Sequence, residues 1–90
     1  WPHMFYMKAE DLWRWKMNVA RVMGNTRDDV YVPELVQAFQ REQDERVRGM
    51  CAWALGRIGG PAARRALESF QGAAQGLVAD EVALALVMIS

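Results

Sequence analysis

Cysteine, histidine and net charge are all scarce in this 90-residue sequence, and each scarcity excludes a class of protein. One cysteine excludes a disulfide framework, a zinc finger and an iron–sulfur cluster held by this chain alone. Eleven Lys and Arg residues balance eleven Asp and Glu residues, which excludes a strongly basic nucleic-acid binder. The lack of a signal peptide and of any run of about 18 apolar residues predicts a cytoplasmic protein with no membrane partner.

What the sequence does contain is typical of a small folded domain. Hydrophobic residues make up 52% of the chain and charged residues 24%, which argues against disorder. Ninety residues suffice for one hydrophobic core, so residues 1–90 are predicted to form a single domain. Because the chain opens with Trp1 rather than methionine, we expect a C-terminal fragment of a longer chain.

The sequence repeats itself with a period of 31 to 32 residues. Residues 52–58 match residues 83–89 at two alanines, a leucine and an isoleucine. Other pairs at this spacing are Phe39 with Phe70, Gly24 with Gly56, Arg14 with Arg46, and Lys16 with Arg48. A period of this length holds two short helices and two turns, so the repeating unit is predicted to be a helix pair.

Local signals predict five helices. Pro33 suits a first helical position, and Asp44 suits the N-cap of the next helix. The predicted helices span residues 9–23, 33–41, 45–58, 61–70 and 77–89. Gly24-Asn25 is predicted to stop the first helix, which leaves residues 26–32 as a turn.

Helices of this length are marginal alone in water, so each pair must bury its apolar face on the next pair. The predicted fold is therefore all-α, an α-solenoid of about two and a half repeats. Small residues at equivalent positions are expected to let neighbouring helices approach closely: Ala20, Ala52 and Ala83. The predicted core contains Phe39, Leu55, Ile58, Phe70, Leu86 and Ile89.

Three segments resemble HEAT-like repeats of the bilin-lyase type: residues 31–39, 44–49 and 52–60. The sequence DERVRG at 44–49, followed by AWALGRIGG at 52–60, is similar more narrowly to the C-terminal HEAT-like region of bacterial epoxyqueuosine reductases and related iron–sulfur oxidoreductases. In those enzymes another helix precedes this region. The residues of the present chain that look like part of it are Trp13-Arg14, Asn18 and Met23-Gly24-Asn25. The resemblance implies an α-solenoid of HEAT-like helix pairs.

The narrower resemblance also implies a function. Epoxyqueuosine reductases use a cobalamin and two 4Fe–4S clusters, bound upstream of the HEAT-like region, to complete queuosine in the tRNA anticodon loop. Their HEAT-like domain is associated with holding the tRNA. By this resemblance the present segment holds no cofactor itself, and it contacts the upstream domain of its parent chain and tRNA.

Charged residues are unevenly distributed along the chain. Residues 8–24 and 45–59 carry more basic than acidic side chains, whereas residues 76–90 carry acidic ones alone. Cations on the second helices of consecutive repeats are suited to follow a phosphate backbone. The candidate nucleic-acid-binding residues are Arg14, Lys16, Arg21, Arg46 and Arg57.

Other notable side chains are interpreted as packing or interface groups. Arg48 is interpreted as structural, because the Asp-x-x-Val-Arg pattern of HEAT repeats typically joins a carboxylate such as Asp44 to an arginine. Cys51 is equivalent to Val19 and Val82, so it is predicted to be a buried thiol. Five aromatic residues near the N-terminus predict an interface with the upstream domain or with a second copy, and base stacking is the alternative: Trp1, Phe5, Tyr6, Trp13 and Trp15.

No nucleophile or acid–base constellation is visible, so this segment is not predicted to be an enzyme. The leading hypothesis is a recognition module of an epoxyqueuosine-reductase-like iron–sulfur oxidoreductase that holds tRNA or another macromolecular substrate. The alternative hypothesis is a protein–protein interaction scaffold that binds a partner helix or loop.

Overall fold

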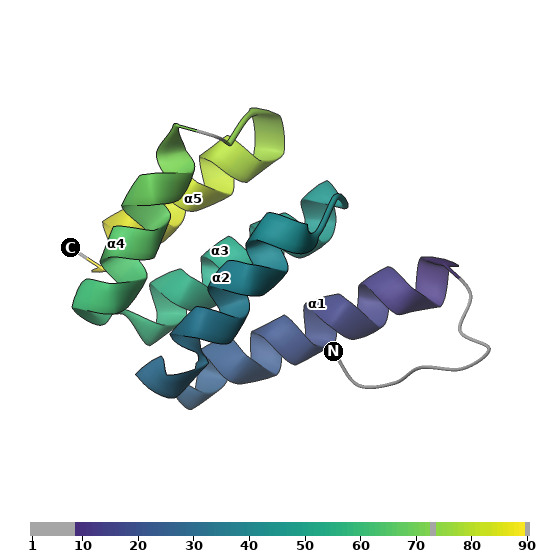
Figure 1. Cartoon of the computed structure of the whole chain (residues 1–90), viewed down its shortest axis with the longest axis horizontal. Coiled ribbons are helices and arrows are strands. Elements are labelled where there is room, and N and C mark those ends of the chain that lie inside the picture. The colour runs from purple at the N-terminus through teal and green to yellow at the C-terminus, as the bar shows by residue number, and fades with distance from the viewer. Residues whose placement is uncertain (1–8, 73, 90) are drawn as a thin grey trace.

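Five α-helices make up the part of the chain that the computed structural model describes, residues 9–72 and 74–89 (Figure 1). They are α1 (Ala9–Thr26), α2 (Val32–Arg41), α3 (Glu45–Ile58), α4 (Gly60–Gln71) and α5 (Gly76–Ile89), with a 3-10 turn η1 (Asp29–Tyr31) before α2. Because these residues contain no strand, the all-α prediction is confirmed for them. The starts of the last four helices lie within one residue of the predicted starts.

The helices form two layers. The first layer consists of α1, α3 and α5, with α3 packed against both of the others. The second layer consists of α2, which packs on α3, and α4, which packs on α3 and α5 (Figure 1). The molecule measures 41 × 27 × 16 Å along its principal axes, as expected for a short stack of helix pairs. The predicted α-solenoid architecture is confirmed.

The start and end of α3 follow from local sequence signals. At its start the Asp44 side chain accepts a hydrogen bond from the backbone N–H of Arg46 at 2.9 Å, as an N-cap residue does. At its end Gly59 takes a positive φ of 70°, which an L side chain rarely adopts. The predicted N-cap at Asp44 and the predicted helix end at Gly59 are both confirmed. Such ends can be predicted from sequence, because a helix cap depends on only a few neighbouring residues.

The prediction that Gly24 stops the first helix is wrong. The helix continues through Gly24 to Thr26, and Arg27 follows with a positive φ of 55°. Gly24 is buried against α3, where an added Cβ would lie 2.8 Å from the Cα of Ala54. The glycine therefore serves the crossing of two helices rather than a turn.

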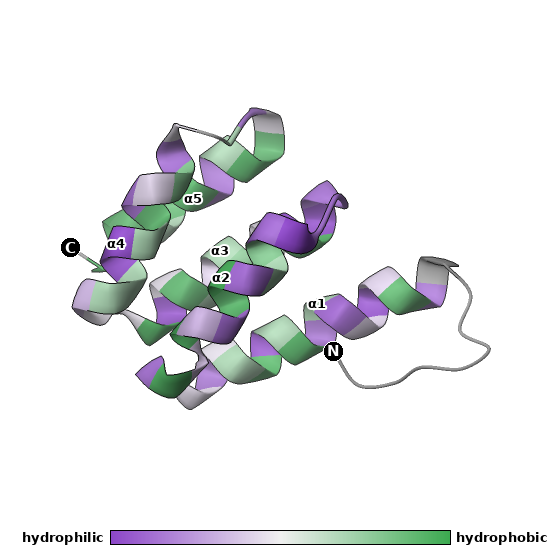
Figure 2. Cartoon of the chain, viewed as in Figure 1, coloured by the Kyte–Doolittle hydropathy of each residue, from purple (hydrophilic) through white to green (hydrophobic). Residues whose placement is uncertain are grey.

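The buried hydrophobic residues form one core cluster with members from all five helices, and hydrophobic positions recur along each helix (Figure 2). Phe39 of α2 and Phe70 of α4 are buried and stack with their ring centroids 3.8 Å apart. Leu55 of α3 is fully buried in the same cluster. The other predicted core residues are partly buried and pack against this cluster: Ile58, Leu86 and Ile89.

The three alanines that were expected to allow close helix packing differ in burial. Ala20 and Ala52 are fully buried, as expected. Ala83 is exposed, which corrects the expectation for that position. It lies on α5, and no further helix packs on the outer side of α5 within the described part of the chain.

Candidate functional site

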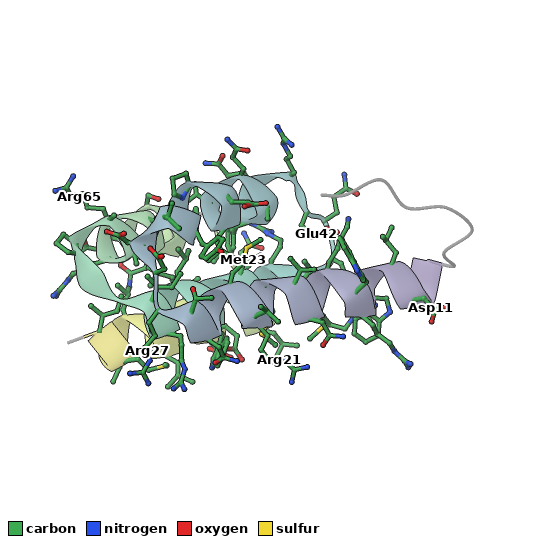
Figure 3. The ribbon with its side chains drawn as sticks, turned by 90° about the horizontal axis from the view of Figure 1, so that it is seen from below. Asp11, Arg21, Met23, Arg27, Glu42 and Arg65 are labelled. Carbon is green, nitrogen blue, oxygen red and sulfur yellow. The ribbon has the colours of Figure 1, made fainter. Side chains whose placement is uncertain are left out.

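The first layer has one side that α2 and α4 do not cover, and we call this side the open face. Side chains spaced i, i+4, i+7 and i+11 reach it from each of the three helices. Its residues are Arg14, Asn18, Arg21 and Asn25 of α1; Arg46, Met50, Trp53 and Arg57 of α3; and Leu77, Glu81, Leu84 and Met88 of α5. Figure 3 shows Arg21 on this side and Arg65 of α4 on the opposite side of the molecule.

A groove of about 350 Å³ crosses the open face between α1, α3 and α5. Apolar side chains from all three helices line it: Met17, Met50, Trp53 and Leu77. Charged side chains stand around them, with Arg21 and Arg46 beside Glu45 and Glu81. A groove with an apolar lining and charged borders is suited to bind an amphipathic segment.

The α1 side of the open face is basic and polar. The guanidinium of Arg21 donates a hydrogen bond to Asn18 Oδ1 at 2.6 Å. The Nε of Arg57 donates to Asn25 Oδ1 at 3.3 Å, which links α3 to α1 across the face. All four of these side chains are exposed. These contacts orient the two guanidinium groups without neutralising their charges.

Arg46 is held by a carboxylate and by an aromatic ring. Its Nε and Nη2 donate to the two carboxylate oxygens of Asp44 at 3.1 and 2.8 Å. Its guanidinium also stacks 3.6 Å from the centre of the Trp13 ring. The hydrogen bonds from Arg46 lower the pKa of the Asp44 carboxyl, so the pair is charged at neutral pH. Asp44 thus pairs with Arg46 and not, as the sequence pattern predicted, with Arg48.

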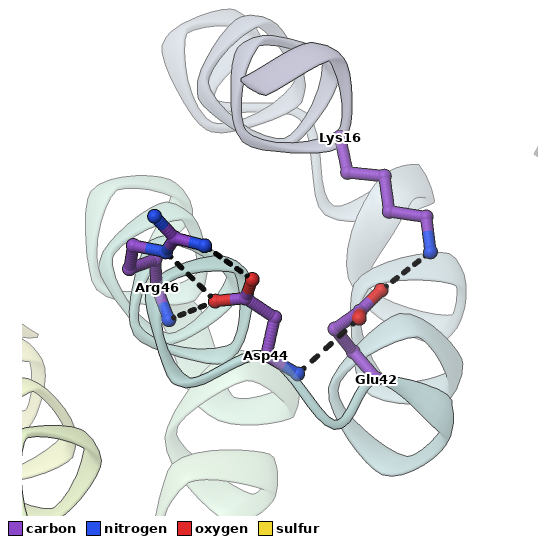
Figure 4. A network of polar contacts seen from close by, with 4 residues as sticks. All are labelled: Lys16, Glu42, Asp44 and Arg46. Atoms are coloured by element: carbon purple, nitrogen blue, oxygen red, sulfur yellow. Dashed lines mark hydrogen bonds and ion pairs between the residues drawn. The ribbon is translucent and has the colours of Figure 1, made fainter. Parts of the chain in front are cut away.

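Lys16 lies away from the open face, unlike the other four candidate nucleic-acid-binding residues. Its Nζ is 2.7 Å from Glu42 Oε2, in the link between α2 and α3 (Figure 4). The two side chains are 20% and 12% exposed. The second carboxylate oxygen of Glu42 accepts a hydrogen bond from the backbone N–H of Asp44 at 3.3 Å. Lys16 therefore stabilises the connection of the two layers.

Cys51 is buried as predicted, whereas Arg48 packs on an aromatic ring and not against the carboxylate that the sequence pattern indicated. The Arg48 guanidinium lies 4.5 Å from the centre of the Phe39 ring, between α3 and α2. Cys51 is fully buried, and its burial raises the pKa of the thiol to about 12. Neither residue contributes to the open face.

The α5 side of the open face is apolar, and sequence reasoning missed it. Leu77, Leu84 and Met88 are 69%, 55% and 44% exposed. They form a second stripe beside the buried stripe of Val78 and Val82 on the same helix. The signal was present in the sequence, because α5 is apolar around most of its circumference (Figure 2). A helix that is packed on one side and apolar all round presents hydrophobic surface to solvent.

The predicted N-terminal aromatic cluster is only partly described. Trp1, Phe5 and Tyr6 lie outside the described residues, as does His3. Trp13 is half-buried under Arg46, and Trp15 lines a separate groove on α1.

The described residues form neither a membrane-spanning helix nor a metal-binding cluster. None of the helices over 9–72 and 74–89 is long and apolar enough to cross a membrane. The same residues contain no group of three or more His, Cys, Asp or Glu side chains that could hold a metal ion.

Comparison with known proteins gives one match. The family model described as HEAT repeats matches residues 7–87. No curated protein and no solved structure matches the chain significantly.

Proposed function

The chain belongs to the HEAT-repeat family, and on that premise we propose that it is a protein-interaction module whose open face binds one amphipathic, acidic protein segment. HEAT repeats generally mediate protein interactions, and such domains are typically non-catalytic. One observation carries the proposal: four arginines and an exposed apolar stripe share the same face of the first layer.

The apolar half of the open face supplies the driving force for binding. Leu77, Leu84 and Met88 expose apolar surface next to the groove that contains Trp53. Burying a fully exposed leucine contributes about 1.5–3 kcal/mol, so two or three of them dominate the free energy of a small interface. A contiguous apolar patch of this kind typically marks an interaction surface.

The basic half of the open face selects the charge of the partner. Arg14, Arg21 and Arg57 are exposed, and a guanidinium binds a carboxylate through paired hydrogen bonds. Packed helix axes lie about 8–10 Å apart, and a bound helix is about 10–12 Å wide. A single helix laid along α3 therefore reaches the arginines on its α1 side and the leucines on its α5 side.

RNA fits this face less well than a protein segment does. The apolar α5 half offers nothing to phosphates, and its one charged residue among those that define the open face, Glu81, repels them. Lys16, one of the candidate RNA contacts, forms an ion pair with Glu42 away from the open face. The observation that favours tRNA is the gathering of four arginines on one face. Holding of tRNA for an epoxyqueuosine-reductase-like parent enzyme, with cobalamin and 4Fe–4S clusters upstream, is therefore the competing proposal.

The test compares substitutions in the two halves of the open face. The probe is a fluorescein-labelled synthetic helix with leucines along one side and glutamates along the other, and bulk tRNA is assayed in parallel. The double variant Leu77→Gln/Leu84→Gln is expected to weaken peptide binding at least about tenfold in fluorescence anisotropy. Arg21→Gln/Arg57→Gln is expected to weaken it by a similar factor and to reduce its salt dependence.

Controls of the same chemistry lie outside the open face. Arg64→Gln/Arg65→Gln on α4 and Val30→Gln on η1 change exposed residues and are expected to leave the affinity unchanged. A second peptide with lysine in place of glutamate is expected to bind poorly. The proposal is overturned if tRNA binds tightly with a dependence on the arginines and none on Leu77 and Leu84, because that result assigns the face to phosphates.

A further inference from the structure

Glu81 interrupts the apolar row that α5 contributes to the open face. Leu77 lies one helical turn before it, and Leu84 and Met88 follow at one and two turns. The two leucines are 69% and 55% exposed, whereas Glu81 is half-buried. Glu81 also lines the groove between α1, α3 and α5. A carboxylate therefore lies within a surface that otherwise offers apolar contacts to a partner.

Gly49 of α3 explains why Glu81 is half-buried. Gly49 is itself buried, and a Cβ added to it would lie 3.3 Å from Cγ of Glu81. The missing side chain of Gly49 leaves room for the aliphatic stem of Glu81 between the two helices. The glutamate is thus held by packing against α3 and is not a fully solvated surface residue.

No cation neutralises Glu81 within the described part of the chain, where its side chain forms no ion pair or hydrogen bond. Two arginines line the same groove, but both have other partners. Arg21 donates a hydrogen bond to Asn18. Arg46 pairs with Asp44. A cation supplied by a bound partner would therefore be the first to compensate the charge of Glu81.

An entirely apolar segment laid over Glu81 would leave a buried charge without a partner. The segment would remove water from the carboxylate, and the leucines beside it would supply nothing in its place. A segment with an acidic residue at this point would add repulsion, and Glu45 of the same groove carries a further negative charge. The carboxylate of Glu81 thus disfavours both kinds of partner.

We propose that Glu81 selects a partner helix that carries one lysine or arginine within its apolar side, where it meets this carboxylate. The inference rests on the proposed function of the open face and adds a chemical requirement for the partner. Such a helix has acidic residues on the flank toward Arg21 of α1 and one basic residue on the flank toward α5. Because the two flanks differ in charge, Glu81 also fixes the direction and the register of the bound helix.

The test uses two peptides that differ in one charge. Both are the fluorescein-labelled synthetic helix described above, with a central leucine replaced by lysine in one and by norleucine in the other. Norleucine has an unbranched carbon chain like that of lysine but no ammonium group. In fluorescence anisotropy the lysine peptide is expected to bind the 90-residue chain about tenfold more tightly than the norleucine peptide. Glu81→Gln is expected to abolish this preference.

Asp80→Asn is the matched control, because it removes a negative charge from the neighbouring position of α5. Asp80 is exposed and does not line the groove, so the preference for the lysine peptide is expected to persist in this variant.

The outcomes separate this inference from the proposed function. The inference is overturned, and the proposed function stands, if the norleucine peptide binds the unmodified chain as tightly as the lysine peptide does. The same holds if the preference for lysine survives Glu81→Gln, or if Asp80→Asn removes it equally well. If neither peptide binds the open face, the proposed function and the inference are both overturned.

Discussion

Asp44 joins three roles in one side chain. It caps α3 and pairs with the guanidinium of Arg46 (Figure 4). Through Arg46 it also helps to hold the Trp13 ring of α1. An N-cap residue of this type contributes about 0.5–2 kcal/mol to stability. The single carboxylate therefore connects the start of one helix to the packing of another.

The charge of Asp44 predicts a pH dependence of stability. Its pKa is lower in the folded state, because Arg46 donates hydrogen bonds to the ionised form. The stabilisation is thus complete above the ordinary carboxyl pKa of about 4, and it is lost as the pH falls through the lowered pKa. Asp44→Asn keeps the N-cap acceptor but removes the charge. We expect its deficit in the free energy of unfolding to shrink as the pH falls from about 5 to about 3 in urea titrations. A deficit that is constant over this range would contradict the assignment.

Cys51 predicts a thiol that is inert in the folded protein. Burial raises its pKa to about 12, so almost no thiolate is present at neutral pH. Alkylation by iodoacetamide at about pH 8 is expected to be at least about a hundredfold slower in the folded chain than in urea. Mass spectrometry of timed samples measures both rates. Similar rates in the two conditions would show that the thiol is accessible.

Residues differ in how far the sequence alone predicts their role. The burial of Cys51 could be predicted, because its repeat partners Val19 and Val82 are apolar. The ion pair of Lys16 with Glu42 could not, because it depends on where the link between α2 and α3 lies relative to α1. Periodicity places residues on faces of a helix, but it does not choose partners for long flexible side chains.

Neighbouring helices of the first layer pack closely because a glycine of one helix meets an alanine of the next. Gly24 and Gly56 are both helical and buried, and each lies against an alanine of the next helix. The 32-residue spacing of these glycines was visible in the sequence, and it correctly indicated a repeat. The interpretation of Gly24 as the end of the first helix was wrong. The sequence alone does not distinguish a glycine that ends a helix from one that lets two helices cross closely, because the position of the neighbouring helix is not known.

Gly56→Ala tests this packing device. The added methyl group would force α3 and α5 apart, so we expect a loss of about 1–3 kcal/mol in the free energy of unfolding. Gly72→Ala is the control, because Gly72 has a φ of −74° and no atom within 4 Å of an added Cβ. That change is expected to be neutral or to stabilise by about 0.4–1 kcal/mol. Equal effects of the two substitutions in denaturant titrations would contradict the close crossing.

At the scale of the whole molecule, the two sides of the first layer have different roles. One side packs on α2 and α4 and holds the core, and the other side forms the open face. The repeat spacing was sufficient to predict that Arg14 and Arg46 occupy equivalent positions. It did not predict that the open-face residues of α5 would be mostly apolar. The open-face side chains change from basic and polar on α1 to apolar on α5, and a repeat period carries no information about such a change.

Position in the stack predicts how much equivalent residues contribute to stability. Met23, Leu55 and Leu86 occupy the same repeat position, but Leu55 lies on the central helix and is fully buried, whereas the other two are half-buried. Leu55→Ala removes side-chain contacts to helices on several sides and leaves a cavity, so we expect a loss of about 2–5 kcal/mol, enough to unfold much of a small domain. Leu86→Ala and Met23→Ala leave partly solvated sites that collapse more easily, and each is expected to cost less than Leu55→Ala. Urea titration of the three variants measures the order. Equal losses would show that the ends of the stack are as tightly packed as its centre.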